Sequence, residues 1–167
     1  AKNELEVSLT SRDKENLSEI RKTKENKKYL PGINIPESIN IKDEILPCLA
    51  NSSVVLLCVK SSGFKKIAAE LNNHMGPEQK LIWATKGLDP DTGETFSETI
   101  KKKMPSLNKT AIISGPTFAE EVAKGKPTAI TLASENIQEL SDLASIMSSS
   151  SFRVYTSNDI VGVQLGG

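Results

Sequence analysis

Short apolar runs alternate along this chain with segments in which apolar residues recur every three or four positions. Consecutive or alternating apolar residues are typical of strands, whereas the longer spacing is typical of one face of a helix. The predicted strands cover residues 5–9, 39–41, 54–59, 81–84, 110–113, 129–132 and 152–155. The predicted helices cover a polar stretch that ends at residue 28, then 45–49, 64–75, 116–124 and 137–147, with another beginning at 95. This alternation predicts an α/β protein with a doubly wound, mostly parallel sheet.

Local signals refine this prediction. Val54–Val59 is apolar throughout, as expected of a parallel strand that is buried on both faces. Thr95 and Glu98 have the spacing of a capping box at a helix start. The stretch Tyr29–Gly32 is expected to interrupt regular structure, because proline and glycine disfavour both helix and strand interiors.

Composition excludes several classes of protein. The 167 residues suit one compact domain, and 21 basic residues balance 21 acidic ones, which argues against a nucleic-acid partner. Cys48, Cys58 and the single histidine His74 lack the spacing of a zinc site or a disulfide framework, so we expect no metal. No apolar run is long enough to span a membrane and no signal peptide is recognisable, so we expect a cytoplasmic protein.

Polar clusters follow the predicted strands directly. In a doubly wound sheet, ligands bind beyond the carboxyl ends of the strands. The clusters are Arg12–Asp13, Lys60–Gly63, Thr85–Gly87 and Ser114–Thr117. We therefore expect them to converge on one crevice.

Lys86 and the Ser114–Thr117 cluster each allow two interpretations. The Lys86 ammonium at a strand end could donate to a carbonyl, hydroxyl or phosphate oxygen, or it could be an ordinary surface lysine. Gly115 leaves the backbone bare for close approach of a small, oxygen-rich ligand, and Pro116 favours a helix start. The alternative for Thr117 is a capping box with Glu120.

Arg12 and Asp13 occupy the place where dinucleotide-binding folds read the adenosine ribose. An arginine there suits a 2′-phosphate and an acid suits the free hydroxyl, so the presence of both leaves the choice open. Asp13 could also simply cap the following helix. The ten glycines include no G-x-G-x-x-G spacing, so no phosphate-cradling turn is recognisable.

Taken together, these motifs closely resemble the bacterial NAD(P)-dependent glycerol-3-phosphate dehydrogenases. The segments that carry the resemblance are Trp83–Leu88, Ile113–Val122, Pro127–Ile130, Phe152–Tyr155 and Asp159–Gly167. Their number and order extend the resemblance over nearly the whole chain. It implies a Rossmann-like nucleotide domain without its first strand and glycine-rich turn.

The resemblance also implies a reaction, which is the reversible reduction of dihydroxyacetone phosphate to sn-glycerol 3-phosphate for glycerophospholipid synthesis. NAD or NADP is the implied cofactor. Lys86 matches a residue that contacts both cofactor and substrate, while Gly115 and Thr117 match substrate contacts. Ala119 matches a cofactor contact, and Arg12 matches the position beside the ribose.

Departures from the family pattern limit these expectations. The segment with the catalytic lysine is not among these residues, so we expect no catalytic residue in this chain and little or no activity of the piece alone. Residues 1–156 are expected to form a truncated dinucleotide-binding domain, and 157–167 the start of a connecting helix to a helical substrate domain. Val59–Ser61 reads valine-lysine-serine where relatives often have valine-proline-serine.

Two further expectations and two alternative functions follow. The parent protein is expected to be a homodimer. Without the family's first strand, an apolar strand should be left open at the sheet edge, with lower stability and a tendency to associate. The alternatives are a noncatalytic module that binds nucleotides or phosphate metabolites, and a related two-domain dehydrogenase with another substrate.

Overall fold

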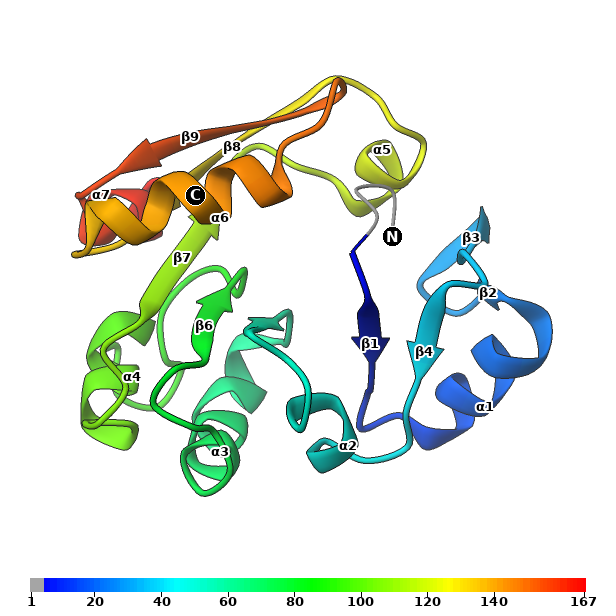
Figure 1. Cartoon of the computed structure of the whole chain (residues 1–167), viewed down its shortest axis with the longest axis horizontal. Helices are drawn as coiled ribbons and strands as arrows, with labels where there is room; N and C mark the ends of the chain where they lie inside the picture. Colours follow the sequence, from blue (N-terminus) through cyan, green and yellow to red (C-terminus); the bar gives the residue numbers. More distant parts are fainter. Residues whose placement is uncertain (1–4) are drawn as a thin grey trace.

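The computed structural model describes residues 5–167, except for the side chains of residues 137–140 (Figure 1). The strands are β1 (Val7–Leu9), β2 (Glu25–Asn26), β3 (Leu30–Asn34), β4 (Ile39–Ile41), β5 (Val54–Leu57), β6 (Lys80–Trp83), β7 (Thr110–Ser114), β8 (Thr128–Ala133) and β9 (Phe152–Ser157). The helices are α1 (Lys14–Thr23), α2 (Leu46–Leu49), α3 (Ser61–Asn72), α4 (Phe96–Lys103), α5 (Ala119–Ala123), α6 (Ile137–Met147) and α7 (Ile160–Leu165).

The largest sheet has five strands in the order β5-β6-β7-β8-β9. All neighbours in it are parallel except β7 and β8, which run antiparallel with Ile112 opposite Ala133. Two further pairs lie apart from this sheet: β1 is parallel to β4, and β2 forms an antiparallel hairpin with β3. The expectation of a mixed α/β protein with a mostly parallel sheet is confirmed.

Helices cover both faces of the five-stranded sheet because successive side chains of a strand point to opposite faces. Leu81 and Trp83 of β6 pack with Phe64 of α3 and Phe96 of α4 in one core cluster. Ile82, the intervening residue, packs in a second cluster with Leu143 of α6. In the first cluster the ring centroids of Phe64 and Trp83 are 6.2 Å apart, and those of Phe64 and Phe96 are 4.3 Å apart.

The expectation that Val54–Val59 is buried on both faces is wrong. The strand ends at Leu57, and the side chain of Leu56 is 49% exposed. The reason is strand order, because β5 is the edge strand of its sheet and pairs only with β6. The exposed Leu56 on edge strand β5 agrees with the expected open strand edge. Association of two molecules through this edge stays a prediction.

The N-terminal region also departs from the pattern analysis. The polar stretch is helical only to Thr23, and Lys24 ends α1 with a φ of 54° in the left-handed region. The predicted break at Tyr29–Gly32 instead contains the start of β3. This short strand accommodates Pro31 and Gly32, and the N–H of Gly32 donates to Glu25 Oε1 at 2.6 Å.

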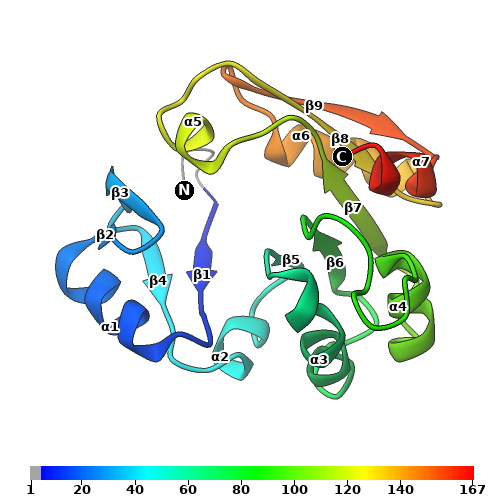
Figure 2. The same cartoon turned by 180° about the vertical axis from the view of Figure 1, so that it is seen from behind.

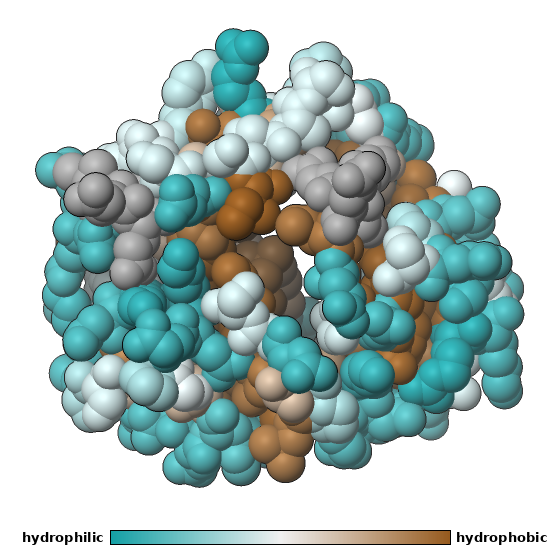
Figure 3. All heavy atoms as spheres, in the orientation of Figure 1, coloured by the Kyte–Doolittle hydropathy of each residue, from teal (hydrophilic) through white to brown (hydrophobic). Residues whose placement is uncertain are grey.

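The elements fall into two groups in space. Figures 1 and 2 show β1–β4 with α1 on one side and the five-stranded sheet with α3 and α4 on the other. Figure 3 shows apolar residues around the hollow between them. In the described part of the chain, no helix is long and apolar enough to cross a membrane. In the same part, no three His, Cys, Asp or Glu side chains are grouped to hold a metal ion.

Candidate functional site

The segment that follows β6 is fixed by buried contacts. Thr85 is 4% exposed, and its Oγ1 donates a hydrogen bond to the Val59 carbonyl oxygen at 2.9 Å. The N–H of Ala84 donates to the Leu57 carbonyl oxygen at 3.0 Å. Gly87 has a φ of +84°, a conformation that side chains other than glycine's rarely adopt. The backbone on both sides of Lys86 is therefore held in one conformation.

Lys86 extends from this segment to the end of β7. Its Nζ donates to the carbonyl oxygen of Gly115 at 2.9 Å, although the residue as a whole is exposed. An ammonium has three N–H donors, so this bond leaves two of them available to a ligand. The contact directs the Lys86 ammonium toward the end of β7, and a role in ligand binding stays a prediction.

Close packing against β8 requires a glycine at position 115. A Cβ at this position would lie 3.0 Å from the Ala129 carbonyl oxygen and 3.2 Å from Ile130 Cα. Both atoms are backbone atoms of β8, which cannot move aside without disturbing the strand pairing. Gly115 therefore lets β8 approach closely enough to bring its side chains to the same site as Lys86.

The capping-box interpretation of Thr117 is wrong, and so is the helix start at Pro116. Helix α5 begins at Ala119, its N-cap is Phe118, and no side chain caps it. Glu120 instead forms an ion pair with Lys124, with an Nζ to Oε1 distance of 2.5 Å, and this pair lowers the pKa of Glu120. The Thr117 N–H donates to the Gly115 carbonyl oxygen at 2.8 Å, which turns the chain before the helix. The Thr117 hydroxyl is thus not a helix cap.

A cavity of about 460 Å³ lies where these segments meet. It is lined by Ala84, Lys86, Ile113, Ser114, Thr117, Ala119, Val122, Ala123, Ile130 and Phe152. Lys86, Thr117 and Ala119 of the predicted site thus border one cavity, and Gly115 joins them through its bond to Lys86. Lys86 is the one charged side chain in this lining, so the cavity combines a single cation with small and apolar residues.

Arg12 does not border this cavity and lies beside the start of α3. A Cβ added to Gly63 would lie 2.7 Å from Nη2 of Arg12, so the guanidinium rests directly on the bare backbone of this glycine. The contact joins the polar cluster after β1 to the cluster after β5. The single crevice expected from the sequence is therefore not found: the structure has two separate features, the cavity and the contact of Arg12 with Gly63, here called the Arg12 corner.

Asp13 is the N-cap of α1 and an ion-pair partner. Its Oδ1 accepts a hydrogen bond from the Asn16 N–H at 3.0 Å, and its Oδ2 lies 2.6 Å from Lys28 Nζ. The bond from Lys28 is the main cause that holds the pKa of Asp13 below its ordinary value, followed by the bond from Asn16. The helix-cap interpretation of Asp13 is confirmed.

Pattern analysis did not identify Gln164, which ties α7 to the cavity. This side chain is 3% exposed, its Nε2 donates to the Gly87 carbonyl oxygen at 3.3 Å, and its Oε1 accepts from the Ser97 N–H at 3.4 Å. It thereby links the residue after Lys86 to the first turn of α4. The available signal was a glutamine within the apolar segment Ile160–Leu165.

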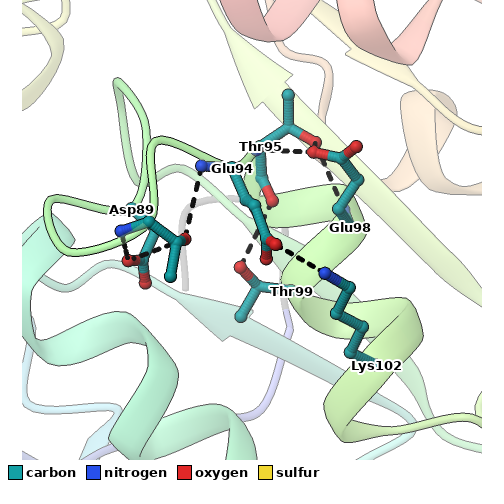
Figure 4. Close-up of polar contacts among 7 residues, drawn as sticks. Asp89, Glu94, Thr95, Glu98, Thr99 and Lys102 are labelled. Carbon is teal, nitrogen blue, oxygen red and sulfur yellow. Dashed lines mark hydrogen bonds and ion pairs between the residues drawn. The ribbon is translucent and has the colours of Figure 1, made fainter.

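The loop between β6 and α4 is built around a buried carboxylate (Figure 4). Asp89 is 3% exposed, and its Oδ1 accepts from the N–H groups of Asp91 and Thr92 and from the Thr92 hydroxyl. Burial raises the pKa of Asp89, but these hydrogen bonds outweigh it and the pKa is lowered. The loop ends in the predicted capping box of Thr95 and Glu98, which is confirmed. These hydrogen bonds hold the loop after Lys86 together from Asp89 to the start of α4.

Comparison with known proteins identifies the family. Residues 1–140 match the family model described as the N-terminus of NAD-dependent glycerol-3-phosphate dehydrogenase. The chain belongs to this family. It is 39% identical over 167 residues to a glycerol-3-phosphate dehydrogenase [NAD(P)+] of Nitrosococcus oceani, a match that covers 100% of the chain and 48% of the relative. It is 36% identical to the enzyme of the same name from Escherichia fergusonii, covering 50% of that relative. The chain thus spans about half the length of these relatives.

Solved structures show the same arrangement of elements. A crystal structure of glycerol-3-phosphate dehydrogenase from Coxiella burnetii aligns with a TM-score of 0.89 and 30% identity, and covers 95% of this chain and 48% of that one. A PanE/ApbA family ketopantoate reductase from Ralstonia eutropha aligns with a TM-score of 0.69 and 16% identity, over 98% of this chain and 52% of that one. The second likeness concerns the fold alone. The Rossmann-like fold class expected from the sequence is therefore confirmed.

Proposed function

We propose that the complete protein is an enzyme that reversibly reduces dihydroxyacetone phosphate to sn-glycerol 3-phosphate, with NADH or NADPH as reductant, for glycerophospholipid synthesis. The observation that carries the proposal is the hydrogen bond from Lys86 to the Gly115 carbonyl oxygen, beside a cavity that Lys86, Thr117 and Ala119 border. The chain in which this site occurs belongs to the glycerol-3-phosphate dehydrogenase family. A phosphorylated ketone needs a cation and hydroxyl donors, and both are offered there.

The residues present fit a dinucleotide. Ala119 presents a methyl group to the cavity, and small side chains leave room for a flat ring. Arg12 supplies an exposed guanidinium beside Gly63, outside the cavity lining, and a cation of this kind suits the adenosine end of an extended ligand. We assign Arg12, Lys86 and Ala119 to the cofactor and Lys86, Gly115 and Thr117 to the substrate.

The nicotinamide cofactor, when bound, supplies the hydride that reduces the ketone. The residues of this chain bind and orient the substrate. The two free donors of Lys86 Nζ can hold the carbonyl or a phosphate oxygen of the substrate and stabilise negative charge on that oxygen. The Thr117 hydroxyl, which here donates to the Gly115 carbonyl oxygen at 3.5 Å, can turn to donate to a second oxygen of the substrate. Apolar side chains such as Ile130 and Phe152 reduce access of water.

The proton for the new alcohol needs a second titratable group. In the described cavity lining, Lys86 is the single titratable side chain, and it is committed to binding. We propose that the catalytic proton donor lies in another part of the complete protein, and that residues 157–167 lead toward a helical substrate domain. Residues 1–156 alone would then be a binding domain without turnover.

The experiment compares this chain with a completed protein, in which the remaining segments of the Nitrosococcus oceani relative are joined to it in their native order. The loss of reduced nicotinamide absorbance is measured with and without dihydroxyacetone phosphate. Substrate-dependent turnover by the completed protein only is the expected result. Turnover by the 167-residue chain itself would contradict the assignment of the proton donor, and inactivity of both, with folding verified by circular dichroism, would contradict the proposed reaction.

Two alternative functions have distinct signatures. A related dehydrogenase with another substrate would reduce a different ketone in the completed protein, and a panel of 2-keto acids and other ketones tests this alternative. A noncatalytic module would bind nucleotides or phosphate metabolites without turnover. The homodimeric state, the cytoplasmic location and the absence of a nucleic-acid partner remain predictions, and light scattering of the completed protein tests the first.

A further inference from the structure

Gln164 is a buried polar side chain of α7 to which the proposed function gives no part. It is 3% exposed, and it is not among the described residues that line the cavity. Removing an amide from water costs free energy unless its hydrogen-bonding groups find partners inside the protein. The groups that Gln164 contacts therefore indicate what it does.

Both partners of Gln164 are backbone groups at the two ends of the loop between β6 and α4. Its Nε2 donates to the Gly87 carbonyl oxygen at 3.3 Å, and its Oε1 accepts from the Ser97 N–H at 3.4 Å. Ser97 lies in the first turn of α4, where the N–H groups have no acceptor within the helix. One side chain thus joins the two ends of the loop that begins directly after Lys86.

The bond from Gln164 acts on the segment that carries Lys86. The Gly87 carbonyl belongs to the peptide group that directly follows this glycine, and a glycine restricts its own backbone less than any other residue does. On the other side of Lys86, the Thr85 hydroxyl holds the chain through its bond to the Val59 carbonyl oxygen. Loss of the Gln164 bond would therefore free one side of the Lys86 segment and leave the other side held.

Helix α7 is itself fixed against the sheet that forms the cavity. It packs against β7 and β8, and its Ile160 lies in the same core cluster as Trp83 of β6. After α7 the chain passes so close to the cavity lining that a Cβ at Gly167 would collide with the side chain of Ser114. Because the core sets the position of this helix, Gln164 offers a fixed point to the loop that it contacts.

We propose that Gln164 is a positioning residue for Lys86, which holds the Gly87 carbonyl and thereby directs the Lys86 ammonium toward the end of β7. The inference rests on the proposed function, which assigns this ammonium to the substrate. Gln164 acts through Lys86 and not by contact with a ligand. A purely structural role at the start of α4 would instead affect stability and leave the binding of substrate by Lys86 unchanged.

The first experiment measures steady-state kinetics of the completed protein with dihydroxyacetone phosphate. Gln164→Met replaces the amide by a side chain of similar length without its hydrogen bonds, and should raise KM about fivefold, the effect of one lost hydrogen bond. A smaller amount of folded enzyme would lower the apparent kcat and leave KM as it is. An unchanged KM in this variant would overturn the inference.

A double-mutant cycle tests whether the effect passes through Lys86. If it does, adding Gln164→Met to Lys86→Met should change kcat/KM by less than about twofold, because the group that Gln164 positions is already absent. Two residues that act independently would give a double variant whose loss is the product of the two single losses. That result would contradict a positioning role.

Gln164→Glu separates the two bonds of this side chain and preserves its shape. At about pH 9, well above the ordinary glutamate pKa of about 4.3, the carboxylate can accept from the Ser97 N–H but has no proton for the Gly87 carbonyl. KM should then rise as in Gln164→Met. A KM equal to that of the unsubstituted protein would assign the role to the Ser97 bond and overturn the inference.

Thr99→Val is the matched control for the loss of a buried polar group. Thr99 of α4 is also 3% exposed, and its hydroxyl donates to the Thr95 carbonyl oxygen at 3.2 Å (Figure 4). Its replacement should lower the melting temperature while KM stays within about twofold. Thermal unfolding of every variant verifies that the protein compared is folded. A rise in KM as large as that of the Gln164 variants would show that any buried loss in this region has the same effect.

A readout without substrate separates the inference from the proposed function. Acetylation by a trace of acetic anhydride, followed by mass spectrometry, compares Lys86 with Lys66 of α3 in the same sample. Gln164→Met should raise the relative labelling of Lys86 about fivefold, because its ammonium loses the bond to the Gly115 carbonyl oxygen that stabilises its charged form. This change in a protein that does not reduce dihydroxyacetone phosphate would retain the inference and overturn the proposed reaction. Reduction of the ketone with unchanged labelling and unchanged KM would do the opposite.

Discussion

The cavity beside Lys86 and the Arg12 corner beside α3 are held in place by different kinds of interaction. The strand that leads to Lys86 is part of the main core, where Trp83 is 1% exposed and packs against Phe64. The region around Arg12 has a smaller apolar base, in which Leu17 and Ile20 of α1 are buried. Around that base lie exposed ion pairs, among them Lys28 with Asp13 and Arg21 with Asp43.

This difference has a functional consequence. Core packing is dense, so residues at the ends of buried strands cannot be displaced without a large cost in stability. Exposed ion pairs typically contribute less than about 1 kcal/mol and can be exchanged one at a time. We therefore expect the cavity side to have one fixed geometry, whereas the Arg12 corner can change its ligand preference through single surface substitutions.

The largest effect is expected from removing the aromatic centre of the core. Phe64→Ala should lower the free energy of unfolding by about 3–5 kcal/mol, because the side chain is completely buried between Trp83 and Phe96. Urea unfolding measures the change. The control is Phe118→Ala, whose side chain is 72% exposed and should cost less than about 0.5 kcal/mol. Similar losses of unfolding free energy in both variants would contradict the conclusion that core packing holds the cavity side in place.

A large effect on function is expected from the cation in the cavity. Lys86→Met in the completed protein should lower kcat/KM for dihydroxyacetone phosphate roughly 10- to 100-fold, through loss of a charge-assisted bond of about 1.5–3 kcal/mol. Unfolding free energy should change little, since Lys86 is exposed. Lys66→Met removes another exposed lysine on α3 and serves as the control. Unchanged steady-state kinetics in the Lys86 variant would exclude it from the substrate site.

The close approach of β7 and β8 predicts a cost for any side chain at position 115. Gly115→Ala should destabilise the protein by about 1–3 kcal/mol, because the new Cβ meets backbone atoms of β8 at 3.0 and 3.2 Å. Gly76→Ala is the matched control, since a Cβ there would meet only the Gln79 Oε1 at 4.0 Å. Differential scanning calorimetry compares the two, and equal melting temperatures would contradict the packing role of Gly115.

A moderate effect is expected where the loop after Lys86 enters α4. Thr95→Ala should cost about 1 kcal/mol, because it removes the side chain that caps the helix. Thr95→Ser retains the hydroxyl and should recover most of that stability in chemical unfolding. A loss in the serine variant as large as that in the alanine variant would show that the methyl group, and not the cap, supports the loop.

The smallest effect concerns the Asp13 ion pair and its dependence on pH. The folded-state pKa of Asp13 is lowered, first by Lys28 and then by the Asn16 N–H, so its stabilising contribution is complete above the unfolded-state pKa of about 3.9. That contribution is lost as the pH falls through the lower folded-state pKa. The stability difference between the unsubstituted protein and Asp13→Asn should thus be present at neutral pH and vanish in strong acid. A difference that is constant with pH would exclude the ion pair as its source.

Local pattern predicted most of the regular structure. The apolar runs at β6, β7, β8 and β9 are strands, because a local run of apolar residues is enough to indicate a strand. The capping box at Thr95 is present, because its two partners are only three residues apart. One error falls where distant segments decide, because Leu56 is exposed through the place of β5 in the strand order. The other is a local turn that the spacing did not reveal, because the Thr117 N–H bonds to Gly115 and the helix begins only at Ala119.

The sequence by itself determined the α/β class and the residue types that gather at the strand ends, since periodicity records which side chains avoid water. Only the tertiary structure decided which of those residues meet. Lys86 reaches Gly115, and Arg12 rests on Gly63, across separations that no local pattern encodes. The same holds for Asp13, whose engagement by Lys28 depends on the return of the β2–β3 hairpin. Side-chain availability is a property of the assembled fold, because each group binds a ligand only with the hydrogen-bonding capacity that its neighbours leave free.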